Sequence, residues 1–231
     1  LAGMDRSQLL EKNAEIFVAA GKALEQFGSK NCRVVVVANP ANTNCYIMQQ
    51  QCPSIPKENF TALTRLDHNR AVAQLAQKLH VGNSDVQKAY ILGNHSNTMV
   101  PCCDHVEVQG KKAELDATWV KDSFTPTVQT RGAAVIAARQ KSSAMSAANA
   151  AANHMYDWIV GTDEWVSMAI VSSGQYGIEQ GIVYSFPCIC KDGKWTVVEG
   201  LEFPEATKAA MIKTQEELCS ERDIFHGFGK Q

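Results

Sequence analysis

The chain has 231 residues, enough to bury a sizeable core in one large domain or two smaller ones. With 45% hydrophobic and 20% charged residues, its composition is that of an ordinary soluble globular protein. Its formal net charge of −2 offers no positive field to a phosphate backbone, and no apolar run approaches the roughly 20 residues that span a bilayer. We therefore expect no nucleic-acid partner and no membrane association.

Eight cysteines are spread along the chain, and no secretory signal precedes them. We expect them to be reduced thiols, and the cytoplasm is the expected compartment. The two tightest groups are Cys102-Cys103-Asp104-His105 and Cys188-Ile189-Cys190. Neither has the spacing of about two to four residues that structural zinc sites use between paired cysteines. No metal site is therefore predicted.

The first elements form a strand–loop–helix pattern. Residues 4–28 carry apolar side chains at helical spacing, and Gly28 closes the predicted helix. A continuous β-branched run follows at 33–38, which is typical of a strand buried on both faces of a parallel sheet. The turn-rich stretch 39–44 leads into a second helical segment, which completes one βα unit.

The middle of the chain continues with helices and one strand. A helix is predicted over about 69–79, and a strand over 88–93 ends on the polar residues 94–96. Residues 131–160 are rich in alanine and helical in pattern, with an interruption near 141–143.

The last third of the chain has strands followed by a helix. Strand-like pieces lie at 166–172, 182–190 and 195–199, and Asp192-Gly193 indicates a hairpin turn between the last two. An amphipathic helix over about 204–225 follows. The fold class is therefore α/β, with two structural regions that meet near residue 63.

Four polar residues could carry chemistry: Asn39 and His95 at strand ends, and Asp67 and Arg70 three residues apart on one helix face. The imidazole could exchange protons near neutral pH, the Asp67 carboxylate could orient it, and the guanidinium could grip a carboxylate. Each feature also has a structural explanation: a core histidine, a solvated ion pair and an ordinary Asn-Pro turn. The residues themselves thus lead to an anion-binding α/β enzyme and no further.

Nine short segments, in the same order along the chain, resemble the malate/lactate dehydrogenase family, most closely its cytosolic-type malate dehydrogenases. Together they extend over nearly the whole chain. They are GMDR (3–6), NPANTNC (39–45), SIPKENF (54–60), LTRLDHNRA (63–71), GNHS (93–96), RGAAVI (131–136), SSAMSAA (142–148), YSFP (184–187) and VEGL (198–201).

The resemblance implies a role for each polar residue. Asp67 is expected to orient the catalytic His95, and Arg70 to bind the carboxylate of a 2-oxo acid. Arg6 is expected to lie on a mobile loop and polarise the reacting carbonyl. Asn39 is expected to bind both the substrate and the nicotinamide side of the cofactor.

Three further residues, Asn13, Val37 and Ser146, match family positions that line the cofactor or the active site. The implied reaction is reversible hydride transfer between NAD and malate or oxaloacetate, and a homodimer is expected. The implied architecture is the carboxyl-terminal part of a Rossmann-type parallel sheet at 1–62, followed by an α+β substrate domain at 63–231.

The chain also departs from the family pattern. It has neither a Gly-rich turn after a first strand nor the acidic ribose-binding residue, and Gly174 and Gly177 lie outside such a context. The family position that selects the substrate falls before Leu1. Two alternatives therefore stay open: a related 2-hydroxy acid dehydrogenase for lactate or aromatic substrates, and a truncated, non-catalytic subunit.

Overall fold

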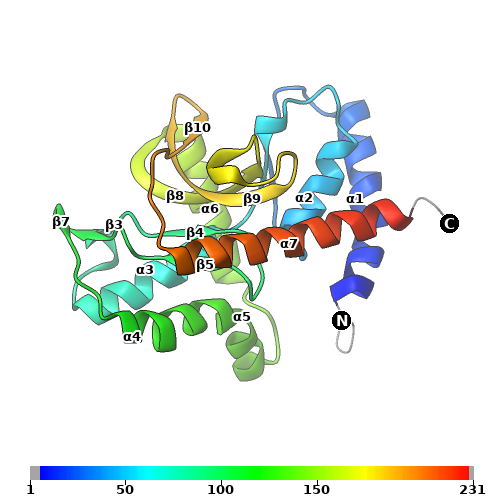
Figure 1. Cartoon of the computed structure of the whole chain (residues 1–231). Coiled ribbons are helices and arrows are strands. Elements are labelled where there is room, and N and C mark those ends of the chain that lie inside the picture. The colour runs from blue at the N-terminus through cyan, green and yellow to red at the C-terminus, as the bar shows by residue number, and fades with distance from the viewer. Residues whose placement is uncertain (1–5, 229–231) are drawn as a thin grey trace.

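The computed structural model describes residues 6–228, and Figure 1 shows their arrangement. The helices are α1 (Arg6–Phe27), α2 (Ala41–Gln50), α3 (Arg65–Leu79), α4 (Ala117–Trp119), α5 (Thr125–Arg139), α6 (Met145–Val160) and α7 (Glu205–Phe228), with short helical turns at Lys57–Asn59, Asn83–Asp85, Val120–Phe124 and Gln175–Gly177. The strands are β1 (Val34–Val36), β2 (Phe60–Ala62), β3 (Val86–Gln87), β4 (Tyr90–Leu92), β5 (Val100–Cys102), β6 (Glu107–Val108), β7 (Lys111–Lys112), β8 (Thr162–Val171), β9 (Val183–Lys191) and β10 (Lys194–Val197).

Within residues 6–228, the main sheet has five strands in the order β1-β2-β8-β9-β10. Strands β1 and β2 are parallel, and β8, β9 and β10 continue the sheet in antiparallel fashion. Two small sheets, β3-β6-β7 and β4-β5, complete the strands. Helix α7 runs across the molecule from the β10 side towards α1 and α2 (Figure 1).

Strand β1 pairs with β2, and its Val34 and Val35 are only half-buried. Val36 is buried, but the Val37 residue that follows is 46% exposed. The expectation that 33–38 is buried on both faces is therefore wrong. A run of β-branched residues indicates a strand, but how deeply that strand is buried depends on which neighbours cover it.

The pairing of β2 with β8, between Thr61 and Ile170, joins the predicted domains 1–62 and 63–231 in one continuous sheet. The proposed division between them stays a prediction. The predicted hairpin is confirmed, because β9 and β10 pair through a turn in which Asp192 and Gly193 have φ values of 52° and 72°. Positive φ at both central residues is what a tight hairpin turn of this kind requires.

Helix α3 begins at Arg65, four residues before the expected start. Thr64 precedes the helix, but its side chain makes no capping hydrogen bond. The residue type that usually marks a helix start therefore does not cap this helix. The sequence does not predict the two-residue strands β3, β6 and β7. They are too short to show an alternating pattern and exist because a partner segment pairs with them.

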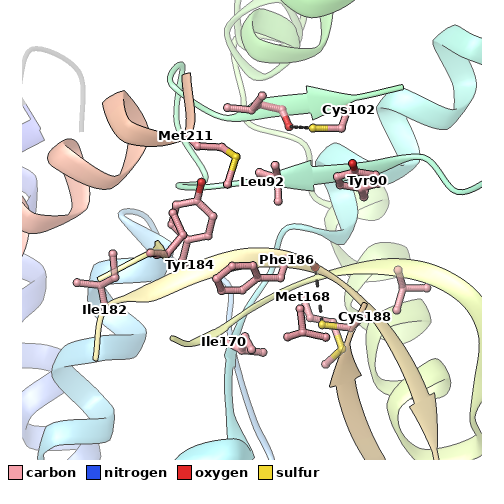
Figure 2. Close-up of a cluster of buried hydrophobic side chains, with 14 of the residues drawn as sticks. Tyr90, Leu92, Cys102, Met168, Ile170, Ile182, Tyr184, Phe186, Cys188 and Met211 are labelled. Carbon is pink, nitrogen blue, oxygen red and sulfur yellow. Dashed lines mark hydrogen bonds between the residues drawn. The ribbon is translucent and has the colours of Figure 1, made fainter. Parts of the chain in front are cut away.

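The largest hydrophobic cluster lies between the main sheet, β4 and α7 (Figure 2). Tyr90, Ile91 and Leu92 of β4 are all fully buried, so this strand is a rigid base for the loop that follows it. All eight cysteines are free thiols, and six of them are buried. Burial, followed by the charge of Asp104, raises the pKa of Cys103 to about 12, which leaves this thiol a packing group.

Two buried histidines make the fold sensitive to acid. The His154 ring lies 3.0 Å from the Thr61 hydroxyl, and Nδ1 of His68 lies 3.0 Å from the Ser167 hydroxyl. Burial, and next the positive charge of Arg65, lower the pKa of each imidazole to about 3. Both rings therefore stay neutral in the folded protein at a pH where an exposed histidine is protonated.

Since the unfolded chain binds these protons first, stability is present above a pH of about 6.5 and is lost as the pH falls towards 3. As the pH falls from 6.5 to 5, we expect the free energy of unfolding to decrease by about 2 kcal/mol for each buried histidine. Urea denaturation at one protein concentration should show a shallower pH dependence for His154→Gln than for the wild type. An exposed-histidine control, His80→Asn, should keep the wild-type slope; equal slopes for all three proteins would contradict the prediction.

Candidate active site

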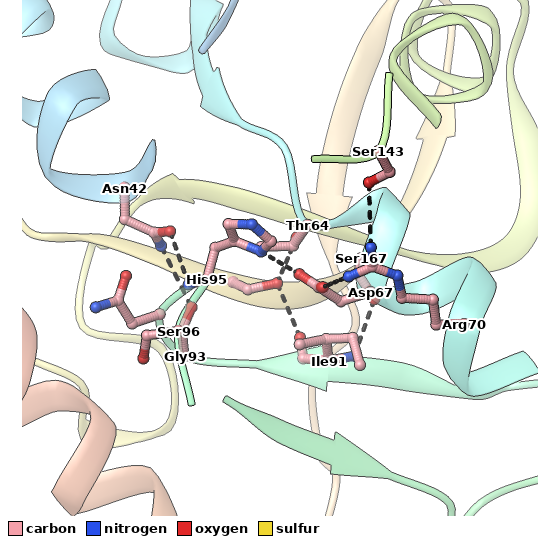
Figure 3. A network of polar contacts seen from close by, with 12 residues as sticks. Asn42, Thr64, Asp67, Arg70, Ile91, Gly93, His95, Ser96, Ser143 and Ser167 are labelled. Atoms are coloured by element: carbon pink, nitrogen blue, oxygen red, sulfur yellow. Dashed lines mark hydrogen bonds and ion pairs between the residues drawn. The ribbon is translucent and has the colours of Figure 1, made fainter. Parts of the chain in front are cut away.

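Three of the predicted site residues meet in one cluster. The Nδ1 atom of His95 is hydrogen-bonded to Oδ2 of Asp67, and Nη1 of Arg70 donates to the other carboxylate oxygen over 3.3 Å. The Asp67 side chain is fully buried, whereas His95 and Arg70 are 19% and 15% exposed. Asp67 thus lies at the base of the cluster, with a proton-carrying ring on one side and a cation on the other (Figure 3).

Asp67 occupies the first turn of α3, where the helix dipole favours a negative charge. Its neighbour in the cluster, Arg70, also reaches towards the loop between α5 and α6, where Nη2 lies 3.4 Å from the Ser143 hydroxyl. Burial is the largest effect on the pKa of Arg70 and lowers it; the charge of Asp67 opposes this shift, and Arg131 adds to it. This guanidinium is therefore a desolvated cation with one carboxylate partner in place.

The strand before His95 is fixed by two buried serines from the main sheet, of which Figure 3 labels Ser167. The amide of Ile91 donates to Oγ of Ser167 over 2.9 Å, and Oγ of Ser185 donates to the Ile91 carbonyl over 2.9 Å. Gly93 then pairs with Ser185 through two backbone hydrogen bonds of 3.2 and 3.0 Å. Together these contacts fix where β4 ends and the His95 loop begins.

Asn42, in the first turn of α2, holds the His95 backbone directly. Its Oδ1 accepts from the His95 amide over 3.0 Å, and its Nδ2 donates to the carbonyls of Gly93 and Val183 over 3.3 and 2.9 Å. The side chain is completely buried. The segment 39–44 therefore lies next to the His95 loop, although the strands before them, β1 and β4, belong to different sheets.

Four further predicted residues with described positions are Asn13 on α1, Val37 and Asn39 after β1, and Ser146 on α6. Asn39 is exposed at the start of the loop after β1, and its carbonyl accepts from Nδ2 of Asn13 over 3.1 Å. Val37 is exposed between β1 and this loop. Ser146 of α6 lines a cavity of about 330 Å³ together with Arg70 and Arg131.

Arg6 begins α1, but its side chain lies outside the described residues, so its predicted role stays a prediction. Reasoning from the residues missed Asn42 and Ser143, although both lie in segments that carry the family resemblance. The available signal for Asn42 was its place in the turn after a strand, where a polar side chain can bind a neighbouring loop. Within residues 6–228, no group of three or more His, Cys, Asp or Glu side chains could hold a metal ion, and no helix is long and apolar enough to cross a bilayer.

Comparison with known protein families places this cluster in a recognised fold. Residues 64–227 match the model described as lactate/malate dehydrogenase, alpha/beta C-terminal domain, and residues 1–61 match the NAD binding domain of the same family. The chain belongs to the lactate/malate dehydrogenase family. The predicted fold class is confirmed: part of an NAD-binding domain followed by an α/β carboxyl-terminal domain.

Two plant relatives extend the match to nearly the whole chain. "Malate dehydrogenase 3, cytoplasmic" of Arabidopsis thaliana is 48% identical over 233 residues, which cover 97% of this chain and 69% of the relative. "Malate dehydrogenase, cytoplasmic" of Mesembryanthemum crystallinum is 46% identical over 231 residues, which cover 96% and 70%.

Two solved structures superpose closely on this chain. Malate dehydrogenase from Naegleria fowleri superposes with a TM-score of 0.95 at 44% identity over 98% of this chain and 71% of that one. Trichomonas vaginalis lactate dehydrogenase, solved in complex with NADH and oxamate, gives a TM-score of 0.93 at 34% identity over 98% and 72%.

Proposed function

We propose that the chain acts as an NAD-dependent malate dehydrogenase, which interconverts malate and oxaloacetate. The observation that carries the proposal is the buried Asp67 carboxylate, in contact with both His95 and Arg70. This arrangement combines a proton donor and acceptor with a binding group for an organic acid. The identity of 48% and 46% with two proteins named malate dehydrogenase supports malate as the substrate.

The residues present fit part of a bound nicotinamide cofactor. Val37 is exposed at the carboxyl end of β1 and Asn39 follows it with its side chain exposed, at the strand end where dinucleotide folds bind their ligand. Asn13 holds the Asn39 backbone, and Ser146 lines the cavity beside Arg70. When bound, NAD would supply the hydride chemistry, and the protein would supply alignment and charge.

The proposed proton relay uses both nitrogens of the His95 ring. Nδ1 is engaged by Asp67, which fixes the ring orientation and stabilises the imidazolium once a proton arrives. In malate oxidation, Nε2 accepts the proton of the substrate hydroxyl; in oxaloacetate reduction, the imidazolium returns it to the forming alkoxide. The buried carboxylate holds Nδ1 and does not itself exchange the proton with the substrate.

Arg70 is proposed to bind the carboxylate next to the reacting carbon. Its planar guanidinium can form two parallel hydrogen bonds with a carboxylate, and its 15% exposure strengthens them by limiting competition from water. Arg6 is proposed to polarise the substrate carbonyl, and Asn39 to bind the substrate beside the cofactor. Both roles rest on the family resemblance.

Steady-state NADH oxidation by the intact protein tests the proposal. We expect the highest kcat/KM with oxaloacetate, and lower values with pyruvate and phenylpyruvate. The structural likeness to the Trichomonas vaginalis lactate dehydrogenase makes pyruvate the informative competitor. Preference for pyruvate or phenylpyruvate would reassign the substrate, while inactivity with all three would favour a non-catalytic subunit.

A homodimer and a cytoplasmic location are also proposed. Tyr156, Ile159 and Val160 on α6 are 63%, 46% and 62% exposed, an apolar surface that a second copy of the chain would cover. Light scattering coupled to size exclusion would detect the dimer, and a monomeric mass would contradict it. Both plant relatives are named as cytoplasmic proteins, which supports that compartment.

A further inference from the structure

The loop that carries His95 is attached to the last helix of the chain by a dense set of hydrogen bonds. One carboxylate oxygen of Glu217, Oε2, accepts from Nδ2 of Asn94 over 2.8 Å, from Oγ of Ser96 over 2.5 Å and from Oγ1 of Thr98 over 2.6 Å. Asn94 and Ser96 are the two neighbours of His95 in the sequence. Glu217 therefore holds the loop on both sides of the imidazole.

A second carboxylate lies one turn further along α7. Glu221 is buried, and its two oxygens accept from the Thr43 hydroxyl of α2 and, over 3.4 Å, from Nδ2 of Asn94. It thereby links the His95 loop to the helix that carries Asn42. The backbone of His95 is thus held by α2 through Asn42, and the flanking side chains are held by α7.

The contact between loop and helix is also close sterically. Thr214, one turn before Glu217, accepts from the Asn94 amide through its Oγ1 atom over 2.9 Å and is itself fully buried. Gly93 has a φ of 92°, and a Cβ atom at this position would collide with the Thr214 side chain. The loop can therefore lie against α7 only because residue 93 has no side chain.

We propose that Glu217 is a positioning residue for the reaction: from α7, with Glu221 beside it on Asn94, it sets the place and orientation of the His95 ring relative to Asp67. The inference rests on the proposed function and extends it to a helix more than 100 residues away in sequence. A carboxylate suits this position because it only accepts hydrogen bonds, and one of its oxygens meets three donors from the loop. A glutamine at position 217 would present to these donors either its own N–H donor or one neutral amide oxygen that would have to accept from all three.

The central test compares Glu217→Gln with Glu216→Gln, the same chemical change at the adjacent, exposed position of α7. Since a displacement of about 1 Å at a reacting group can cost on the order of 100-fold in rate, we expect kcat of Glu217→Gln to fall by about 10- to 100-fold. KM for oxaloacetate should change by less than about threefold, because Arg70 belongs to a different element. Glu216→Gln should match the wild type in both constants.

A readout independent of turnover is the NMR signal of the His95 ring, assigned by its absence from His95→Gln. This signal should move in Glu217→Gln and stay in place in Glu216→Gln. An unchanged signal, or a kcat equal to that of the control, would overturn the proposal. If the wild type turns over none of the 2-oxo acids, the proposed function fails, whereas the NMR comparison still decides whether Glu217 positions the ring.

Ser96→Ala probes the same contact from the loop side and covers the case in which Glu217→Gln does not fold. It removes one donor to Glu217 and should lower kcat in the same direction and shift the same NMR signal. The double variant Ser96→Ala/Glu217→Gln should lose less activity than the product of the two single losses, because both changes break one shared contact. Unchanged kcat and NMR signal in Ser96→Ala, or strictly multiplicative losses in the double variant, would contradict the proposal.

Discussion

His95→Gln is expected to lower kcat for oxaloacetate reduction by about 10²- to 10⁴-fold, the range that a positioned general acid or base contributes. Glutamine can still accept or donate a hydrogen bond, but it cannot carry a proton to the forming alkoxide. KM should change little, because the substrate carboxylate is assigned to Arg70 and not to the imidazole. Steady-state NADH oxidation gives both constants, and circular dichroism establishes that the variant is folded.

Asp67→Asn should act in the same direction, because an amide cannot stabilise the imidazolium and can favour the wrong ring tautomer. Its fully buried position makes a loss of stability part of the expected result, so the His95 variant is the cleaner test. His80→Asn, at an exposed position on the end of α3, serves as a control and should retain wild-type kcat. A folded His95→Gln protein with undiminished kcat would remove His95 from the mechanism.

Arg70→Lys is expected to lower kcat/KM by about 10²- to 10³-fold, mainly through a higher KM, because a partly buried, hydrogen-bonded charge pair is disrupted. Lysine keeps the positive charge but presents it as a single point, so it cannot match both oxygens of a carboxylate at once. The change therefore tests the fork geometry and not the charge alone. KM values for oxaloacetate measure the effect, with the NADH concentration saturating.

A matched control for this variant is Arg139→Lys, at the exposed end of α5. It should leave KM unchanged. A KM for Arg70→Lys within about threefold of the wild type would contradict the assigned role, since the loss of one good charged hydrogen bond alone is worth more than that. In that case Arg131, which lines the same cavity, would be the next cation to test.

Long elements with a clear period could be predicted from the residues alone. The helix α1, the strands β8 and β9 and the helix α7 all appear close to their predicted places. Each has enough residues for its apolar spacing to repeat. Strands as short as β3 and β7 have no such repeat and are stabilised by their partners in space, so local reasoning could not find them.

The candidate site, too, could be predicted only in part from the residues. Residue types and their spacing were enough to single out His95, Asp67 and Arg70, and the family resemblance assigned their roles. Their spacing could not distinguish a functional cluster from a structural histidine beside a solvated ion pair. The fold resolves that ambiguity in one respect, because it buries Asp67 and brings His95, 28 positions away, into contact with it.

The residues that hold this cluster in place were still harder to predict from local sequence patterns. Asn42 reaches His95 across 53 positions, and Glu217 reaches Asn94 across 123. A short polar side chain on a helix carries no sign of the distant loop that it will meet, because a hydrogen bond requires that the folded chain bring donor and acceptor within about 3 Å. Local periodicity and motif order thus sufficed for the main elements and the family, whereas the partners that hold the imidazole in place depend on long-range packing.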